Sequence, residues 1–92
     1  MQIKSIRQKI RKGRFDYSAH ALEEMDEDDL DEADLCNAIL NGVVSAELTD
    51  DPRGIRFVVR GLAGDAVREV EVVCRFLPSG LLRKITVYEL KG

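Results

Sequence analysis

The chain of 92 residues contains no tryptophan, one histidine, two cysteines and two prolines. A zinc site built by this chain alone is not expected, because such sites take about four Cys or His ligands in characteristic spacings. Cys36 and Cys74 lie far apart within apolar segments, where a free thiol behaves as a small buried hydrophobe. A disulfide between them would need an oxidising compartment that nothing in the sequence indicates. We therefore expect reduced cysteines, no metal and no cofactor.

Long apolar runs are also missing. None approaches the roughly 20 residues of a membrane-spanning helix, and none follows the first charges as in a secretory signal. With 45% hydrophobic and 34% charged residues, the composition is that of an ordinary globular domain. A chain of this length builds one core, so we expect a single domain over residues 1–92, a cytoplasmic location by default and no membrane partner.

Positive and negative charges are segregated in the N-terminal third of the chain. Residues 1–14 contain no acid but six basic residues, Lys4, Arg7, Lys9, Arg11, Lys12 and Arg14. Residues 16–34 contain no Lys or Arg but ten acids. This segregation fits two solvated helix faces, an ion-pair network within the chain, a nucleic-acid patch beside an acidic shield, or a docking surface for a basic partner. The sequence leaves these alternatives open.

The first helix is predicted from apolar spacing. Ile3, Ile6 and Ile10 recur at helical intervals with basic residues on the other sides, so residues 2–12 should form an amphipathic helix that ends at Gly13.

A second, short helix should begin after an N-cap at Ser18 or Asp16. The only histidine, His20, falls in its first turn, where the helix dipole favours the neutral imidazole. The apolar residues expected on related faces of this helix are Ala19, Leu22 and Met25.

The third helix carries the clearest start signal. With Asp31 as N-cap, Leu30 and Leu35 occupy the positions of a hydrophobic staple. Ala38 and Ile39 continue the buried stripe, and Asn41-Gly42 predicts the end of the helix.

Beyond Gly42 the hydrophobic period changes from 3.6 to 2, which predicts strands. Four strands separated by turn residues are expected over 44–48, 55–60, 67–76 and 82–90. Consecutive strands with short connections pair antiparallel. The expected fold class is therefore α+β, with two or three N-terminal helices packed on one face of a four-stranded antiparallel meander.

Alternation along the strands assigns their side chains to two faces. The helix-facing set is Ile55, Phe57, Val59, Val70, Val72, Cys74, Phe76, Ile85 and Val87. The outward set is Arg56, Arg60, Val73, Arg75, Lys84, Thr86 and Tyr88. This outward face is basic with one phenol. It is either an ordinary solvated face or a site where cations hold phosphates and Tyr88 stacks on a base or donates a proton.

Short motifs in a distinctive order resemble a known family. They are Ser-x-His-Ala-x-x-x-Met at residues 18–25, a following helix that ends in Gly, and a last strand with Ile-Thr-Val-Tyr at residues 85–88. Over about residues 15–90 the chain resembles the bacterial domain of unknown function numbered 4258, which looks related to the RelE-like and BrnT-like ribonuclease toxins. The resemblance implies a RelE-like α+β fold, RNA as substrate class, and metal-independent cleavage in which the 2′-hydroxyl attacks the adjacent phosphate.

The chain departs from this family in one respect. The family's helix commonly reads His-Ala-x-x-Arg-Met-x-x-Arg, and Glu24 and Asp28 stand here in place of the two arginines. Two anions near His20 repel an RNA backbone and favour the imidazolium. RNA is therefore expected to approach over the sheet.

Two functional hypotheses follow. The first is a toxin-like endoribonuclease of a toxin-antitoxin system, with an antitoxin-like protein covering its site. The residues expected to carry catalysis are Arg75, Lys84, Tyr88 and His20. Those expected to bind RNA phosphates are Arg56, Arg60 and Thr86.

The second hypothesis is a non-catalytic interaction module of the same fold. Its acidic helices would bind a basic protein, either an antitoxin-like partner or a second copy of the chain, through Glu24, Asp28 and Asp29. In this case His20 is a partly buried structural histidine that pairs with neighbouring glutamates.

Overall fold

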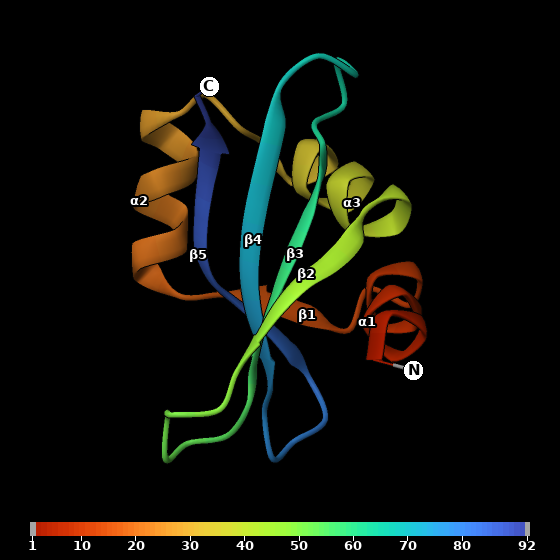
Figure 1. Cartoon of the computed structure of the whole chain (residues 1–92), viewed down its shortest axis with the longest axis vertical. Helices are drawn as coiled ribbons and strands as arrows, with labels where there is room; N and C mark the ends of the chain where they lie inside the picture. The colour runs from red at the N-terminus through yellow and green to blue at the C-terminus, as the bar shows by residue number, and fades with distance from the viewer. Residues whose placement is uncertain (1, 92) are drawn as a thin grey trace.

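A computed structural model describes residues 2–91, which form three helices and five strands (Figure 1). In chain order these are α1 (Gln2–Arg11), β1 (Phe15–Tyr17), α2 (Ala19–Glu27), α3 (Glu32–Asn41), β2 (Val43–Leu48), β3 (Arg56–Leu62), β4 (Glu69–Phe76) and β5 (Leu82–Leu90). The five strands form one sheet in the order β1-β5-β4-β3-β2. The α+β class is confirmed. None of the helices among these residues has the length and apolar character needed to span a membrane.

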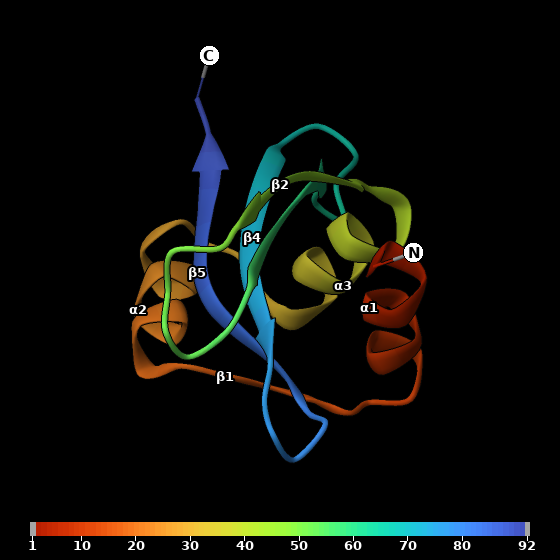
Figure 2. The same cartoon turned by 60° about the horizontal axis from the view of Figure 1, so that its bottom comes forward.

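The four predicted strands are antiparallel neighbours, but the prediction missed a fifth strand that makes the sheet mixed. β1 pairs in parallel with β5, with Phe15 opposite Leu82 and Tyr17 opposite Lys84, while the other pairs are antiparallel. Figure 2 shows β1 running past the lower end of β5 on its way from α1 to α2. Three residues are too few for a period of 2 to be recognised, so sequence alternation missed this strand. Asp16, one of the two proposed helix caps, lies within it.

Ser18 caps α2 and Asp31 caps α3, as predicted. The Ser18 side chain accepts a backbone N–H from the first turn of α2, and the Asp31 side chain accepts the N–H of Asp34 at the start of α3. The Asp34 carboxylate in turn accepts the backbone N–H of Asp31, which completes a capping box. Leu30 and Leu35 are both buried, as the staple requires.

Two glycines allow α3 to pack closely on the sheet. A Cβ at Gly42 would lie 2.2 Å from the carbonyl oxygen of Arg60, and one at Gly61 would lie 2.2 Å from that of Ala38. Any side chain would push the helix away from β3. α3 does end at Gly42 as predicted, but the φ of Gly42 is −97°, so close contact rather than a left-handed cap explains this glycine.

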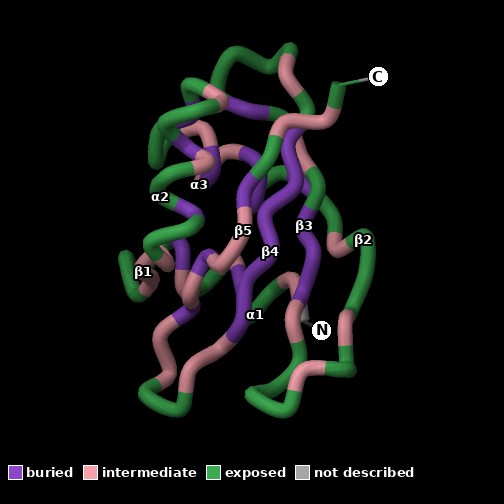
Figure 3. The backbone as a smooth tube through the Cα atoms, turned by 90° about the vertical axis from the view of Figure 1, so that its left-hand side faces the viewer, coloured by how far each residue is buried: buried purple, intermediate pink, exposed green. Residues whose placement is uncertain are grey.

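The core lies between the helices and one face of the sheet (Figure 3). Its buried members include Ile6, Ile10, Ala21, Met25, Leu35, Ala38, Ile39, Phe57, Val59, Val70, Val72, Cys74, Leu82 and Val87. Cys36 and Cys74 are free thiols that pack against or within this core. Ile55 was expected inside, but it precedes β3 and is 43% exposed.

The buried side of α2 differs from the predicted one. Ala21 and Met25 are buried, whereas Ala19 is exposed and Leu22 is 53% exposed. Figure 1 shows why, since α2 lies beside β5 at the edge of the sheet rather than over its centre. Only a narrow stripe of the helix therefore meets the core.

A β-bulge in β5 reverses two predicted directions. Cys74 lies opposite Lys84 and Val73 lies opposite Thr86, so Ile85 is the additional residue of the bulge. As a result Lys84 points to the helices and is fully buried, while Ile85 is not part of the core. From Thr86 onward the strand follows the predicted alternation again.

Candidate functional site on the open sheet face

The face of the sheet away from the helices carries three rows of side chains across β3, β4 and β5. We call it the open face, because no helix among residues 2–91 packs over it (Figure 3). Its first row is Arg60, Glu71 and Tyr88, its middle row is Val58, Val73 and Thr86, and its third row includes Arg56, Arg75 and Arg83. Six of the seven predicted outward residues therefore do share one face, namely Arg56, Arg60, Val73, Arg75, Thr86 and Tyr88.

The first row is a closed hydrogen-bonded group. Arg60 donates from Nε and Nη2 to Oε2 of Glu71 at 3.0 and 2.7 Å, and the Tyr88 hydroxyl donates to Oε1 of the same carboxylate. The Tyr88 bond, aided by Arg60, holds the pKa of the Glu71 carboxyl below its usual value although the side chain is only 9% exposed. The same bond raises the pKa of the Tyr88 phenol. An ionised carboxylate thus sits between a guanidinium and a neutral phenol.

Sequence reasoning did not single out Glu71. The signal was available, because the period of 2 that placed Val73 and Arg75 outward places Glu71 outward too. Its partners Arg60 and Tyr88 were both on the predicted outward face. The carboxylate of Glu71 lies opposite those two side chains and accepts hydrogen bonds from both.

The third row is neutralised by aspartates. Arg56 donates to Asp50 at 3.0 Å, Arg75 donates to Asp51 at 3.3 Å, and Arg83 makes two hydrogen bonds to Asp16 at 3.0 and 2.9 Å. These acids come from the β2–β3 turn and from β1. Hydrogen bonds from Arg53 lower the pKa of Asp51, and the bond from Arg83 lowers that of Asp16. The predicted phosphate ligands therefore already hold anions of their own chain.

One donor of this row is left over. The Nε of Arg56 is buried and lies 3.7 Å from Oδ2 of Asp51, within ion-pair range but beyond a hydrogen bond. Among residues 2–91 it has no hydrogen-bond acceptor. Buried donors without a hydrogen-bond partner cost free energy, and the nearby carboxylate of Asp51 offsets part of this cost.

Lys84 is not on the open face, and the prediction that its side chain points outward was wrong. Its Nζ lies 3.8 Å from the centre of the Phe15 ring and 4.6 Å from that of Tyr17, and it donates to the Tyr17 hydroxyl at 3.2 Å. Tyr17 in turn donates to Glu32 at 2.8 Å. Burial lowers the pKa of the Lys84 ammonium. The bulge of β5 thus places this lysine in an aromatic cage, where it supports the attachment of β1.

His20 also lies outside the open-face group. It is on the first turn of α2, its side chain is 64% exposed, and its Nε2 is 3.4 Å from a carboxylate oxygen of Glu24. Among residues 2–91, no hydrogen bond or ion pair joins it to a side chain of the open face. The expected pairing with a neighbouring glutamate is present, but the histidine is more exposed than a partly buried residue.

Glu24 and Asp28 bond to the edge of the sheet. Glu24 accepts the backbone N–H of Val87 at 2.9 Å, and Asp28 accepts that of Glu89 at 3.0 Å. Ser18 donates its hydroxyl to a carbonyl of the same strand at 2.7 Å. β1 covers only the first part of β5, so α2 supplies partners to the rest of this edge. An arginine cannot accept an N–H, which explains both carboxylates without invoking a partner.

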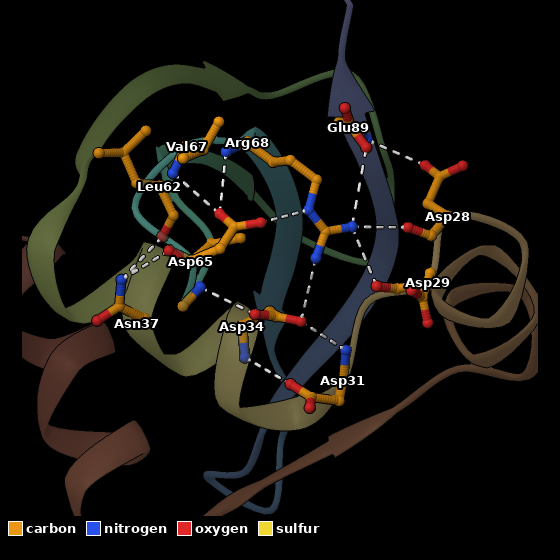
Figure 4. Close-up of polar contacts among 12 residues, drawn as sticks. Asp28, Asp29, Asp31, Asp34, Asn37, Leu62, Asp65, Val67, Arg68 and Glu89 are labelled. Carbon is orange, nitrogen blue, oxygen red and sulfur yellow. Dashed lines mark hydrogen bonds and ion pairs between the residues drawn. The ribbon is translucent and has the colours of Figure 1, made fainter.

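Arg68 draws several acids of the acidic segment together (Figure 4). It bonds to the Asp65 carboxylate at 2.8 Å and to the carbonyl oxygens of Asp28 and Asp29 at 3.0 Å each, and it lies 3.7 Å from a carboxylate oxygen of Asp34 and 3.9 Å from one of Glu89. Hydrogen bonds from the turn lower the pKa of Asp65 to about 2. Arg68 therefore forms an ion-pair network with Asp34, Asp65 and Glu89, which differs from the predicted pairing of the basic segment with the acidic one. No sequence signal pointed to Arg68.

Within residues 2–91, no group of three or more His, Cys, Asp or Glu side chains is arranged to hold a metal ion.

The basic residues of the first segment behave differently. Among residues 2–91, none of Lys4, Arg7, Lys9, Arg11, Lys12 and Arg14 forms an ion pair, whereas Arg53, Arg56, Arg60, Arg68, Arg75 and Arg83 all do. Among the described residues, eight Lys and Arg side chains thus lack an acidic partner, and six of them lie on and just after α1, the other two being Lys84 and Lys91.

Comparison with known proteins places the chain in a family. Residues 17–89 match a family described as a domain of unknown function, DUF4258. The chain belongs to the DUF4258 family. The matched residues of this DUF4258 member include α2, α3, the open face and the β5 edge, whereas α1 precedes them. No match was found among curated proteins or among solved structures.

Proposed function

We propose that this DUF4258 protein is a metal-independent endoribonuclease of the toxin type, and that its site is the first row of the open face. The observation that carries the proposal is the ionised Glu71 held between Arg60 and Tyr88. A base, a cation and a proton donor on neighbouring strands are what cleavage by the 2′-hydroxyl requires without a metal.

The proposed reaction assigns one role to each side chain. Glu71 takes the proton of a ribose 2′-hydroxyl, whose oxygen forms a bond to the adjacent phosphorus while the bond from phosphorus to the 5′-oxygen breaks. Arg60 stabilises the charge on the phosphate oxygens, and Tyr88 gives its proton to the leaving 5′-oxygen. The proton on Glu71 returns to Tyr88 along their hydrogen bond. The products are a 2′,3′-cyclic phosphate and a 5′-hydroxyl.

The remaining predicted residues take other places in this proposal. The partly exposed guanidinium of Arg56 would contact a second phosphate, while Arg75 lies in the same row and Thr86 in the row between it and Glu71. Lys84 and His20 have no role in the chemistry, since the first is in the core and the second is outside the open-face group. An antitoxin-like partner would have to cover the open face to inhibit the reaction.

The test compares two glutamates of the same strand. RNA is incubated in EDTA with the wild-type chain, with Glu71→Gln, and with Glu69→Gln, which changes an exposed glutamate two residues away. We expect Glu71→Gln to cut the cleavage rate by roughly 10²–10⁴-fold, the usual contribution of a general base, and Glu69→Gln to retain it. Intact RNA with the folded wild-type chain, or full activity in Glu71→Gln, would refute the proposal.

A second function is favoured by a different observation. The third-row arginines are paired with aspartates, while acids of α2 such as Glu23, Asp26 and Glu27 are exposed. These acids fit a non-catalytic module that binds a basic protein, an antitoxin-like partner or a second copy. Of the three acids predicted to bind a partner, Glu24 and Asp28 accept backbone N–H groups of β5, and Asp29 is exposed. RNA that stays intact, together with a salt-sensitive association lost in Glu23→Lys/Glu27→Lys, would favour this function.

A further inference from the structure

Helix α1 has one apolar and one cationic side. Ile6 and Ile10 are buried in the core, where the helix packs on α3 and β2. The other side is bordered by an open hollow of about 530 Å³, lined by Lys4, Ser5, Arg7, Gln8 and Arg11. The charged ends recur every three or four residues, so Lys4 and Arg11 are separated by about 10 Å along the helix axis. A row of cations and neutral donors therefore follows the helix.

The helix is anchored firmly enough to present these side chains in a fixed direction. Arg7 donates to the carbonyl oxygen of Gly42 at 2.6 Å and to that of Ile39 at 3.4 Å. These are carbonyls at the C-terminal end of α3, where a cation also meets the favourable end of the helix dipole. Arg7 thus fixes α1 to α3, while Lys4 and Arg11 remain exposed.

The charge of α1 has no counterpart in the described chain. No acid occurs before Asp16, so no carboxylate is available one turn away on the same helix. Most carboxylates of the sheet and turns pair with arginines of the same region, and among residues 2–91 none forms an ion pair with α1. An external polyanion would therefore gain the full attraction of these cations and would release its counterions on binding.

The chemistry of this side favours a nucleic-acid backbone over a protein. Protein interfaces depend on buried aromatic or aliphatic anchors, and the hollow is lined only by Lys, Arg, Ser and Gln. Hydroxyl, amide and cationic donors are the groups that proteins direct at phosphate and sugar oxygens. The acids of α2 and α3 lie elsewhere on the chain and would steer such a backbone towards α1.

We propose that α1 is a docking surface for the phosphate backbone of RNA, separate from the open face and outside the residues that match the family. The choice of RNA over other polyanions rests on the proposed function, but the binding itself does not depend on cleavage. In this arrangement α1 supplies salt-sensitive affinity, and the open face supplies the chemistry.

The test measures binding of an RNA that cannot be cleaved because every 2′-position is O-methylated. The variant Lys4→Gln/Arg11→Gln removes two exposed cations without a helix breaker. Arg14→Gln/Lys91→Gln is the matched control, since it removes the same charge from exposed positions outside α1 that form no ion pair among residues 2–91. Thermal unfolding of both variants checks the fold, and dissociation constants are measured from 50 to 200 mM salt.

We expect the α1 variant to bind more weakly and to lower the slope of log K against log salt by about 1.4, or about 0.7 for each lost phosphate contact with a single strand. The control should keep the wild-type slope. Equal slopes in all three chains would overturn the inference. The inference would also be overturned if the wild-type chain did not bind RNA but self-associated through α1. In that case the surface would bind an acidic protein, a second copy of the chain.

The same measurements separate this inference from the proposed function. Glu71→Gln should bind the methylated RNA as the wild type does while losing cleavage of unmodified RNA. Binding that depends on α1 without any cleavage supports the docking surface and refutes the nuclease. If the α1 variant instead binds and cleaves RNA as the wild type does, even at low enzyme concentration, the nuclease is supported and the docking surface is refuted.

Discussion

The cations of the sheet and those of α1 differ in what they contact. Arg60, Arg75 and Arg83 each hold a carboxylate of their own chain. Lys4 and Arg11 on α1 hold none among residues 2–91. The sheet cations are held in place by acids of the fold, while the helix cations have no acidic partner among the described residues. A count of charges along the sequence could not distinguish the two groups.

Topology accounts for this difference. The β2–β3 turn brings Asp50 and Asp51 to the end of β3, and the parallel pairing of β1 places Asp16 beside Arg83. Sheet formation thus brings acids and arginines from distant positions together. α1 makes no such pairing, because its own segment has no acid and its apolar side faces the core.

The largest expected effect on stability comes from the most deeply buried sheet cation. Lys84→Ala should empty the cage of Phe15 and Tyr17 and lower the free energy of unfolding by about 2–4 kcal/mol. Lys84→Met keeps the volume and removes the buried charge, so it should cost less than about 1.5 kcal/mol. Urea unfolding of both variants gives the comparison. A folded Lys84→Met chain that has lost RNA cleavage would return Lys84 to the catalytic site.

The carboxylates that hold the β5 edge come next. Glu24→Ala leaves the N–H of Val87 without its acceptor and should lower the free energy of unfolding by about 1–2 kcal/mol. Glu24→Gln keeps a carbonyl oxygen in place and should cost clearly less. Both values follow from chemical denaturation. Equal stability of the wild type and Glu24→Ala would mean that this acid serves something other than the edge.

Acid should weaken the sheet pairs and leave α1 unaffected. The pKa values of Asp16, Asp51, Asp65 and Glu71 are all lowered in the folded chain. Their stabilisation is therefore complete above the ordinary carboxyl pKa of about 4, and it is lost as pH falls through the lowered values, to about 2 for Asp65. Melting temperatures between pH 6 and pH 2 should fall mainly below pH 4.

Variants can assign that acid transition. Arg83→Gln removes the partner of Asp16 and should make the fall in melting temperature shallower. Lys4→Gln/Arg11→Gln should reproduce the wild-type profile. If the α1 variant changed the acid transition as much as Arg83→Gln does, its cations would have acidic partners in solution.

The smallest effect on stability is expected at α1 itself. Lys4→Gln/Arg11→Gln changes two exposed side chains without ion pairs, so the free energy of unfolding should stay within about 0.5 kcal/mol of the wild type. Thermal unfolding at neutral pH measures this. A large loss of stability would show that these cations are structural and would remove the contrast with the sheet.

Periodic patterns predicted most of the fold. The spacing of Ile6 and Ile10 predicted α1, the Asp31 cap predicted the start of α3, and alternation predicted β2 to β5. Alternation also brought Arg60 and Tyr88 to one face. These features depend on local sequence, which is why they could be recognised.

The features that were missed depend on contacts between distant residues. β1 exists because β5 offers it an edge, and Lys84 faces inward because one extra residue in β5 shifts the alternation. Arg68 reaches acids some 40 residues away in sequence. The parts of the site that rest on such contacts, including the pairing of each arginine, needed the structure.

A single-turnover experiment on unmodified RNA, with enzyme in excess, tests whether α1 contributes to binding and the open face to cleavage. For Lys4→Gln/Arg11→Gln, we expect the enzyme concentration at half-maximal rate to rise while the rate constant at saturation stays that of the wild type. For Glu71→Gln, the rate constant should fall while half-saturation is unchanged. A lower saturating rate in the α1 variant with unchanged half-saturation would contradict the account.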